Sequence, residues 1–117
     1  MKVYIAGPIT GIPNYKAVFD SAEAHLASQG HTVINPSFLP VGFEHDEYMS
    51  VCLPMVDICE AVVMLPGWED SKGAKTERKY AITQGKMILL YDKWGEYPRQ
   101  EQAGQHPDHY ENRGRYR

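Results

Sequence analysis

Four short apolar runs, separated by segments with helical periodicity, constrain the fold of this 117-residue chain most strongly. The runs are MKVYIA, HTVIN, EAVVMLP and KMILLY, and each is typical of a buried strand. Between them, apolar residues recur every three to four positions over residues 15–29, 46–59 and 73–84, as they do on one face of a helix. Alternating strands and helices predict an α/β protein with a parallel sheet covered on both faces.

Local signals add detail to the predicted helices. Asn14 suits the N-cap of the first helix. The inward face of that helix is predicted to comprise Val18, Phe19, Ala22 and Leu26. Pro54 falls within the second helical pattern, where it is expected to kink the helix or to mark its boundary.

The topology and the domain limits follow from general rules. Right-handed crossovers favour a flavodoxin-like three-layer sandwich with a parallel sheet of four or five strands and the first strand near the centre. The length fits one domain, which we place at residues 1–96. Residues 97–117 are polar and almost without aliphatic side chains, so this tail is expected to be disordered.

Composition excludes several classes of partner. A formal net charge of -3 gives no reason to expect binding to a nucleic acid polymer. No apolar run is long enough to span a membrane and no signal peptide is recognisable, so we expect a cytoplasmic protein. Cys52 and Cys59 would lie ~10.5 Å apart on a helix, too far for a disulfide, and are predicted to be free thiols.

Two loops are expected to form the ligand site. In parallel sheets, ligands bind beyond the carboxyl ends of the strands, where GPITGIPN follows the first strand and PGWEDSKG follows the third. Neither loop matches a dinucleotide fingerprint or a P-loop. The histidines lack metal-site spacing, and no nucleophile elbow occurs. We therefore expect neither a metal nor a cofactor.

One carboxylate stands at the start of the helix that follows the second of these loops. Glu77 is predicted to lie one turn past Gly73, where the helix dipole favours an ionised side chain. An ionised carboxylate can attack the anomeric carbon of a sugar, and Ser71 with the neighbouring N–H groups could hold a phosphate. In the simpler interpretation, Glu77 only stabilises the helix. The basic residues would then form a solvated face; they are Lys72, Lys75, Arg78 and Lys79.

Two motifs carry a family resemblance over residues 2 to about 91. VYIAGPITG is similar to a Tyr-x-x-Gly-x-Ile-x-Gly pattern, and Ser71, Gly73 and Glu77 fit a Ser-x-Gly-x-x-x-Glu pattern. The chain thus resembles the nucleoside 2-deoxyribosyltransferase-like superfamily, which includes 2′-deoxynucleoside 5′-monophosphate N-hydrolases. It looks closest to a branch of short proteins, domain of unknown function 4406.

The resemblance implies roles for individual residues. Glu77 would be the nucleophile at C1′ of the deoxyribose, and Ser71 would contact the 5′-phosphate. The sugar and base pocket would include Tyr4, Gly7, Ile9 and Gly11. Trp68 and Asp70 suit a base-stacking wall and a polar contact; Trp68 is equally suited to be a structural wedge under the loop. Members of the superfamily are usually homodimers or larger, so the resemblance also implies a homo-oligomer.

The sequence departs from the family pattern at two positions. Thr10 stands where the hydrolases carry an arginine, and Cys52 stands where an aspartate usually orients the sugar or handles a proton. The missing aspartate at position 52 implies slow turnover. The leading hypothesis is cleavage or transfer at the N-glycosidic bond of a deoxynucleoside or its monophosphate. The alternatives are a nucleotide-binding module without chemistry and an interaction protein with a vestigial pocket.

Overall fold

A computed structural model describes residues 1–91 and 98–100 of the chain. Its elements are β1 (Lys2–Ala6), α1 (Tyr15–Ser28), β2 (Thr32–Ile34), the 3₁₀ turn η1 (Pro36–Phe38), α2 (His45–Asp57), β3 (Ala61–Met64), the 3₁₀ turn η2 (Trp68–Asp70), α3 (Lys72–Thr83), β4 (Met87–Tyr91) and β5 (Pro98–Gln100). The predicted alternation of strands and helices is therefore confirmed. The two 3₁₀ turns lie in the loops that follow β2 and β3.

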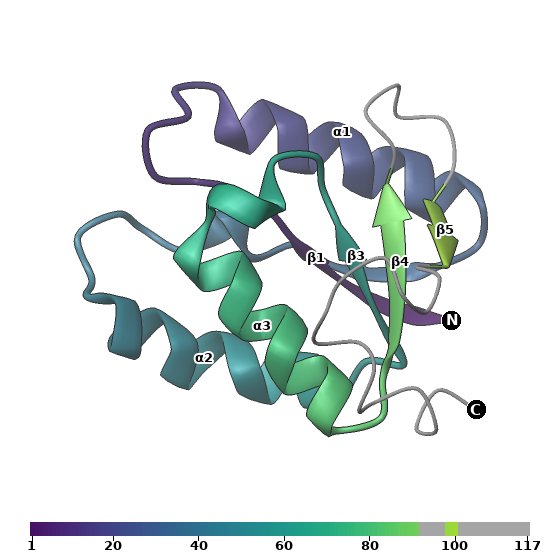
Figure 1. Ribbon diagram of the computed structural model, residues 1–117. Helices are drawn as coiled ribbons and strands as arrows, with labels where there is room; N and C mark the ends of the chain where they lie inside the picture. Colours follow the sequence, from purple (N-terminus) through teal and green to yellow (C-terminus); the bar gives the residue numbers. More distant parts are fainter. Residues whose placement is uncertain (92–97, 101–117) are drawn as a thin grey trace.

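The sheet has the strand order β2-β1-β3-β4-β5. The first four strands are parallel, and β5 pairs with β4 in the antiparallel direction. Helix α1 covers one face, while α2 and α3 lie side by side on the other (Figure 1). This is the predicted flavodoxin-like three-layer sandwich, with β1 inside the sheet as the handedness rule requires.

The central strands divide the core into two halves. Along β1, Val3 and Ile5 pack in the cluster beneath α1, while Tyr4 and Ala6 pack in the cluster beneath α2 and α3. All four residues of β3 are buried, as expected for a parallel strand that is covered on both faces. This alternation sends the side chain of Tyr4 toward α2 and α3, where it meets the candidate site.

One detail of the predicted helices is wrong, and one of the two alternatives given for Pro54 is excluded. Val18 is 40% exposed, and the buried stripe of α1 consists of Phe19, Ala22 and Leu26. Successive residues of an α-helix are rotated by about 100° around its axis, which places Val18 at the edge of this narrow stripe. Pro54 does not mark a helix boundary, because α2 continues to Asp57. Cys52 and Val56, on either side of Pro54, are both buried.

The carboxyl-terminal part of the described chain also differs from expectation. Residues 98–100, which the sequence places in the tail, form β5 beside β4. A short edge strand is held mainly by backbone hydrogen bonds to its neighbour and does not require apolar side chains. The composition of this segment therefore did not indicate a strand. The rest of the predicted tail lies outside the described residues. Within those residues, no helix has both the length and the apolar character to cross a membrane.

Candidate functional site

A cavity of about 700 Å³ opens at the carboxyl edge of the parallel strands. Segments from the loops after β1, β2 and β3 line it, together with α1, α2 and α3. Ten of the eleven site residues predicted from the sequence contribute to its lining: Tyr4, Gly7, Ile9, Thr10, Gly11, Cys52, Asp70, Ser71, Gly73 and Glu77. The structure thus gathers residues from distant parts of the chain around one space.

Glu77 lies deep in this cavity and is bound to the central strand. Its side chain is only 5% exposed, and Oε2 accepts a 2.5 Å hydrogen bond from the hydroxyl of Tyr4. Helix α3 begins at Lys72, so Glu77 is the sixth helical residue and belongs to the second turn. Glu77 does lie one turn past Gly73, as predicted, but the helix dipole acts on it only weakly because the effect falls off within the first turn.

Burial governs the protonation of Glu77. It raises the pKa of Glu77 from an ordinary 4.5 to about 7, although the hydrogen bonds from Tyr4 and Cys52 act in the lowering direction. The prediction that the helix start would favour the ionised form is thus overruled by desolvation, which penalises the charged form of any carboxyl group. Near neutral pH the buried group is divided between its carboxylic acid and carboxylate forms.

Cys52 lies beside this carboxyl group. Its side chain is 4% exposed, and both Tyr4 and Glu77 are its hydrogen-bond partners. Burial raises the pKa of the Cys52 thiol to about 11, and it also holds the pKa of Tyr4 well above 10. Two neutral donors therefore face one carboxyl group. Both cysteines are free thiols, as the sequence predicts.

Ser71 and Gly73 lie where α3 meets the cavity. Ser71 is the N-cap of the helix, and its Oγ accepts a 3.1 Å hydrogen bond from the N–H of Ala74. Its hydroxyl hydrogen remains able to donate to an anion. A Cβ at Gly73 would lie 3.5 Å from the terminal methyl of Met49, which is ordinary contact. Packing therefore does not demand glycine at position 73.

The first loop approaches the end of β3 closely. A Cβ at Gly7 would lie 2.9 Å from Cβ of Leu65, so a larger residue at position 7 would force the loop away from the strand. This approach brings the following residues Ile9, Thr10 and Gly11 to the cavity wall. The glycine that the sequence marks as a site residue thus has a packing role.

Trp68 does not line the cavity. Its ring is 6% exposed and belongs to the core cluster beneath α2 and α3. The guanidinium carbon of Arg78 lies 5.0 Å from the centre of this ring, and Arg78 itself is only 3% exposed. The structure therefore favours the wedge over the base-stacking wall for Trp68, and it removes Arg78 from the predicted solvated face.

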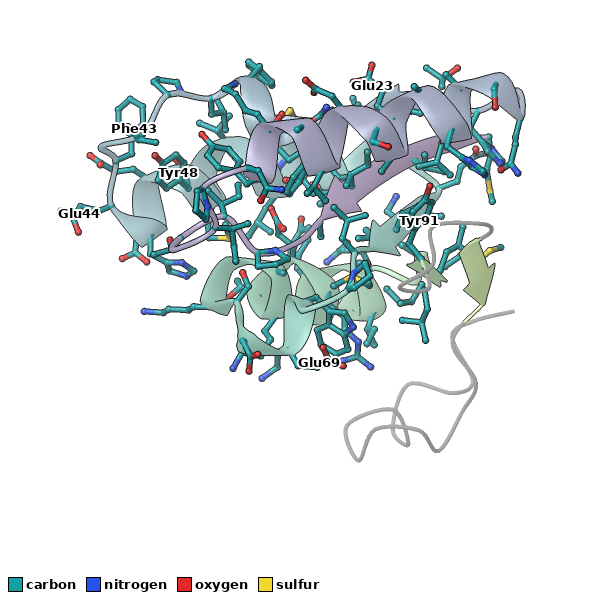
Figure 2. The ribbon with its side chains drawn as sticks, turned by 90° about the horizontal axis from the view of Figure 1, so that it is seen from above. Glu23, Phe43, Glu44, Tyr48, Glu69 and Tyr91 are labelled. Atoms are coloured by element: carbon teal, nitrogen blue, oxygen red, sulfur yellow. The ribbon has the colours of Figure 1, made fainter. Side chains whose placement is uncertain are left out.

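Sequence reasoning missed a third wall of the cavity. The loop after β2 and the first turn of α2 contribute Leu39, Val41, Gly42, Phe43, His45 and Tyr48. Figure 2 shows Phe43 and Tyr48 at the same end of the molecule, away from Tyr91. The signal was present, since this loop also follows the carboxyl end of a parallel strand.

The described residues contain no cluster of three or more histidine, cysteine, aspartate or glutamate side chains suited to a metal ion. The polar groups nearest to Glu77 are a phenol and a thiol that both carry their protons. A buried carboxyl group with protonated neighbours is arranged for proton-dependent or nucleophilic chemistry.

Two solved structures show which class of fold this is. A 2-desoxiribosyltransferase from Leishmania mexicana superposes with a TM-score of 0.61 and 22% identity, covering 77% of this chain and 63% of that chain. A CMP N-glycosidase from Clostridium botulinum, BcmB, gives a TM-score of 0.52 and 21% identity, covering 77% of this chain and 66% of that chain. The chain thus spans just under two thirds of each of these proteins. Their flavodoxin-like fold is the one that the strand order defines here.

The family is defined by the sequence itself. Residues 1–90 match the family described as Domain of unknown function (DUF4406), and the chain belongs to this family. Among curated proteins, none matches the sequence. The family match confirms the predicted resemblance to domain of unknown function 4406, and the fold is the one shared with the 2-desoxiribosyltransferase.

Proposed function

We propose that the protein cleaves the N-glycosidic bond of a deoxynucleoside or a deoxynucleoside 5′-monophosphate, or transfers the deoxyribosyl group to another base. One observation carries this proposal: a buried carboxyl group, Glu77, lines a cavity of about 700 Å³ and accepts a hydrogen bond from Tyr4. That volume lies within the usual range for small-molecule sites. The two similar structures, a desoxiribosyltransferase and a CMP N-glycosidase, support this class of reaction.

In the proposed mechanism, the carboxylate form of Glu77 attacks C1′ of the sugar. The C1′–N bond breaks, and the base departs with the electron pair and takes up a proton. The resulting glycosyl ester is resolved by water in a hydrolase or by a second base in a transferase, which frees Glu77 again. The Tyr4 hydroxyl supports this step because it stabilises the charged form of Glu77 within a buried site.

The phosphate end of the ligand is proposed to lie at the start of α3. Ser71, Lys72 and Gly73 line the cavity there, and free N–H groups with a positive dipole end attract an anion. Asp70 lines the same region and would repel a phosphate, so its side chain is better suited to a sugar hydroxyl.

Release of free base tests the proposal. Purified protein is incubated with a panel of deoxynucleosides and their monophosphates, and free base is measured by chromatography. Glu77→Gln is expected to abolish release, while Glu69→Gln, an exposed residue of η2 outside the cavity lining, is expected to release base at the parent rate. Adding a second free base distinguishes transfer from hydrolysis. Release that survives Glu77→Gln would refute Glu77 as nucleophile.

A binding module without chemistry is the second candidate. The Cys52 thiol has a pKa of about 11 and is therefore protonated at neutral pH. A neutral thiol is a poor substitute for a carboxylate that orients a sugar hydroxyl. A ligand-induced rise in melting temperature without any free base would favour this candidate.

A further inference from the structure

The segment between η1 and α2 presents apolar side chains to the cavity instead of burying them. We call residues 39–43 the rim segment. Val41 is 75% exposed and Phe43 is 52% exposed, yet both line the cavity, as does Leu39. An exposed apolar surface that borders a cavity is typical of a binding surface.

The rim segment is held in place by Tyr48 from the first turns of α2. The Tyr48 hydroxyl donates a 2.6 Å hydrogen bond to the carbonyl of Pro40 and accepts one of 3.4 Å from the N–H of Phe43. The rings of Phe43 and Tyr48 meet edge to face, with centroids 5.6 Å apart. Gly42 has a φ of +113°, a conformation that only glycine adopts readily between these two anchored positions.

The turn into α2 adds a second anchor. Glu44 and Glu47 form a capping box, in which the N–H of Glu44 donates a 2.8 Å hydrogen bond to the Glu47 carboxylate. Figure 2 shows Phe43, Glu44 and Tyr48 together at this end of the molecule. The rim segment is therefore preformed, and a ligand that binds to it does not have to order it first.

None of the side chains of the rim segment carries a hydrogen-bonding group, and the polar lining residue that follows it in the sequence is His45. No asparagine or glutamine side chain occurs among the described residues that line the cavity, and the Tyr48 hydroxyl is already engaged with the rim backbone. Aromatic and aliphatic side chains accept the face or edge of any planar ring, because stacking tolerates every base. The chemistry of the rim therefore suits a flat heteroaromatic ring.

We propose that Val41, Phe43 and Tyr48 form the wall against which the base of the substrate packs, through contacts that any planar base can make and that do not distinguish its donors and acceptors. This inference rests on the proposed function, and it supplies the base contact that Trp68 does not provide from its buried position. The protein would consequently accept purine and pyrimidine deoxynucleotides alike.

Binding to a protein that does not cleave its ligand tests this wall. In the Glu77→Gln background, isothermal titration calorimetry measures the Kd of four deoxynucleoside 5′-monophosphates and of deoxyribose 5-phosphate, which has no base. Adding Phe43→Ala is expected to weaken all four nucleotides by about 10-fold and to leave the sugar phosphate unchanged. Val51→Ala, an exposed position of α2 outside the lining, is the matched control and is expected to change no Kd.

Tyr48→Phe separates the ring from its anchoring hydroxyl. It keeps the aromatic surface but releases Pro40 and Phe43, so weaker binding of all four nucleotides is expected here too. Several outcomes would overturn the inference. The affinity for the sugar phosphate could fall as much as that for the nucleotides, or the affinity could fall for one base only. The nucleotide affinities could stay unchanged, with or without a change in oligomeric state. The parent background could also bind none of the probes.

The same experiment separates this inference from the proposed function. If the parent protein releases no base but Phe43→Ala weakens nucleotide binding as described, the proposed function fails and the wall stands. If the parent protein releases base while Phe43→Ala leaves every Kd unchanged, the wall fails and the proposed function stands.

Discussion

The Tyr4 hydroxyl donates a 2.5 Å hydrogen bond to Oε2 of Glu77, joining β1 to α3 across 73 positions of sequence. Tyr4 is fully buried and Glu77 is 5% exposed, so both groups of this contact have lost most of their hydration. A buried carboxyl group with one phenolic donor is stabilised in its charged form by that donor and destabilised by the loss of solvent. The balance of these effects sets the pH dependence of both stability and activity.

Replacing Glu77 with glutamine is expected to change how stability depends on pH. Because its pKa is raised from 4.5 to about 7 on folding, the stability that Glu77 contributes is fully present below about pH 4.5 and is lost as the pH rises through about 7. The difference between these two pKa values corresponds to a free energy of unfolding on the order of 3 kcal/mol. Glu77→Gln, which stays neutral, should exceed the parent in free energy of unfolding above about pH 8, as measured by urea titration. Parallel pH curves for the two proteins would contradict this.

Tyr4→Phe is expected to shift the pH dependence of base release. It removes a donor that lowers the pKa of Glu77, so that pKa should rise by about one to two pH units. Base release requires the carboxylate form of Glu77. The acidic limb of the pH–rate profile should therefore move to higher pH by the same amount. Rate measurements from about pH 5 to 10 test this. A uniform loss of rate, with the limb unmoved, would mean that Tyr4 acts on the substrate and not through Glu77.

Cys52→Asp is expected to raise the rate of base release by at least about tenfold, because proton handling by a positioned group typically contributes ~10²–10⁴-fold. Position 52 lines the cavity and adjoins Glu77, so the new carboxylate can reach the sugar. Cys52→Ser is the matched control, since a hydroxyl adds polarity without an acid. If the aspartate variant loses stability without gaining rate, position 52 behaves as core, and the binding-module candidate gains.

Ser71 has two roles that can be separated. Ser71→Ala removes the N-cap acceptor of Ala74, which costs ~1 kcal/mol, and it should weaken monophosphate binding more than nucleoside binding. Ser71→Asp keeps a cap acceptor but adds negative charge. It should restore the melting temperature while abolishing monophosphate binding and sparing nucleoside binding. Equal losses for nucleoside and monophosphate in both variants would remove the phosphate contact.

Truncation should distinguish β5 from the residues that follow it. Removing residues 101–117, whose composition cannot support a core, is expected to leave the melting temperature unchanged. A chain that ends at about residue 96 also loses β5, which pairs Arg99 with Leu90 and Gln100 with Leu89. This shorter chain should melt several degrees lower. Equal melting temperatures for the two truncations would show that β5 adds no stability.

The sequence predicted the fold because two strong periodic signals agreed along the chain. Strands such as AVVM are apolar at every position, and a parallel sheet buries them on both faces. Short connections and right-handed crossovers then leave few topologies. The failure in the helices was local: Val18 lies at the edge of the buried stripe of α1 and is exposed.

The site was only partly predictable because its chemistry depends on burial. The family resemblance pointed to Tyr4, Cys52 and Glu77, and all three line one cavity, but no motif measures how much water a carboxyl group loses on folding. The direction of the Glu77 pKa was therefore misjudged. The rim segment was overlooked for a different reason, since its apolar residues were interpreted as an ordinary loop although the segment follows a strand end.

Both edges of the sheet are short, and this restricts how copies of the chain could associate. Among the described residues, β2 forms one edge and β5 the other, and each is three residues long. Pro98 in β5 has no N–H to offer a further strand. Joining two sheets edge to edge would therefore gain very few backbone hydrogen bonds, and edges of this kind guard against aggregation. Among the described residues, the helices and loops therefore offer more surface for association than the edges of the sheet do.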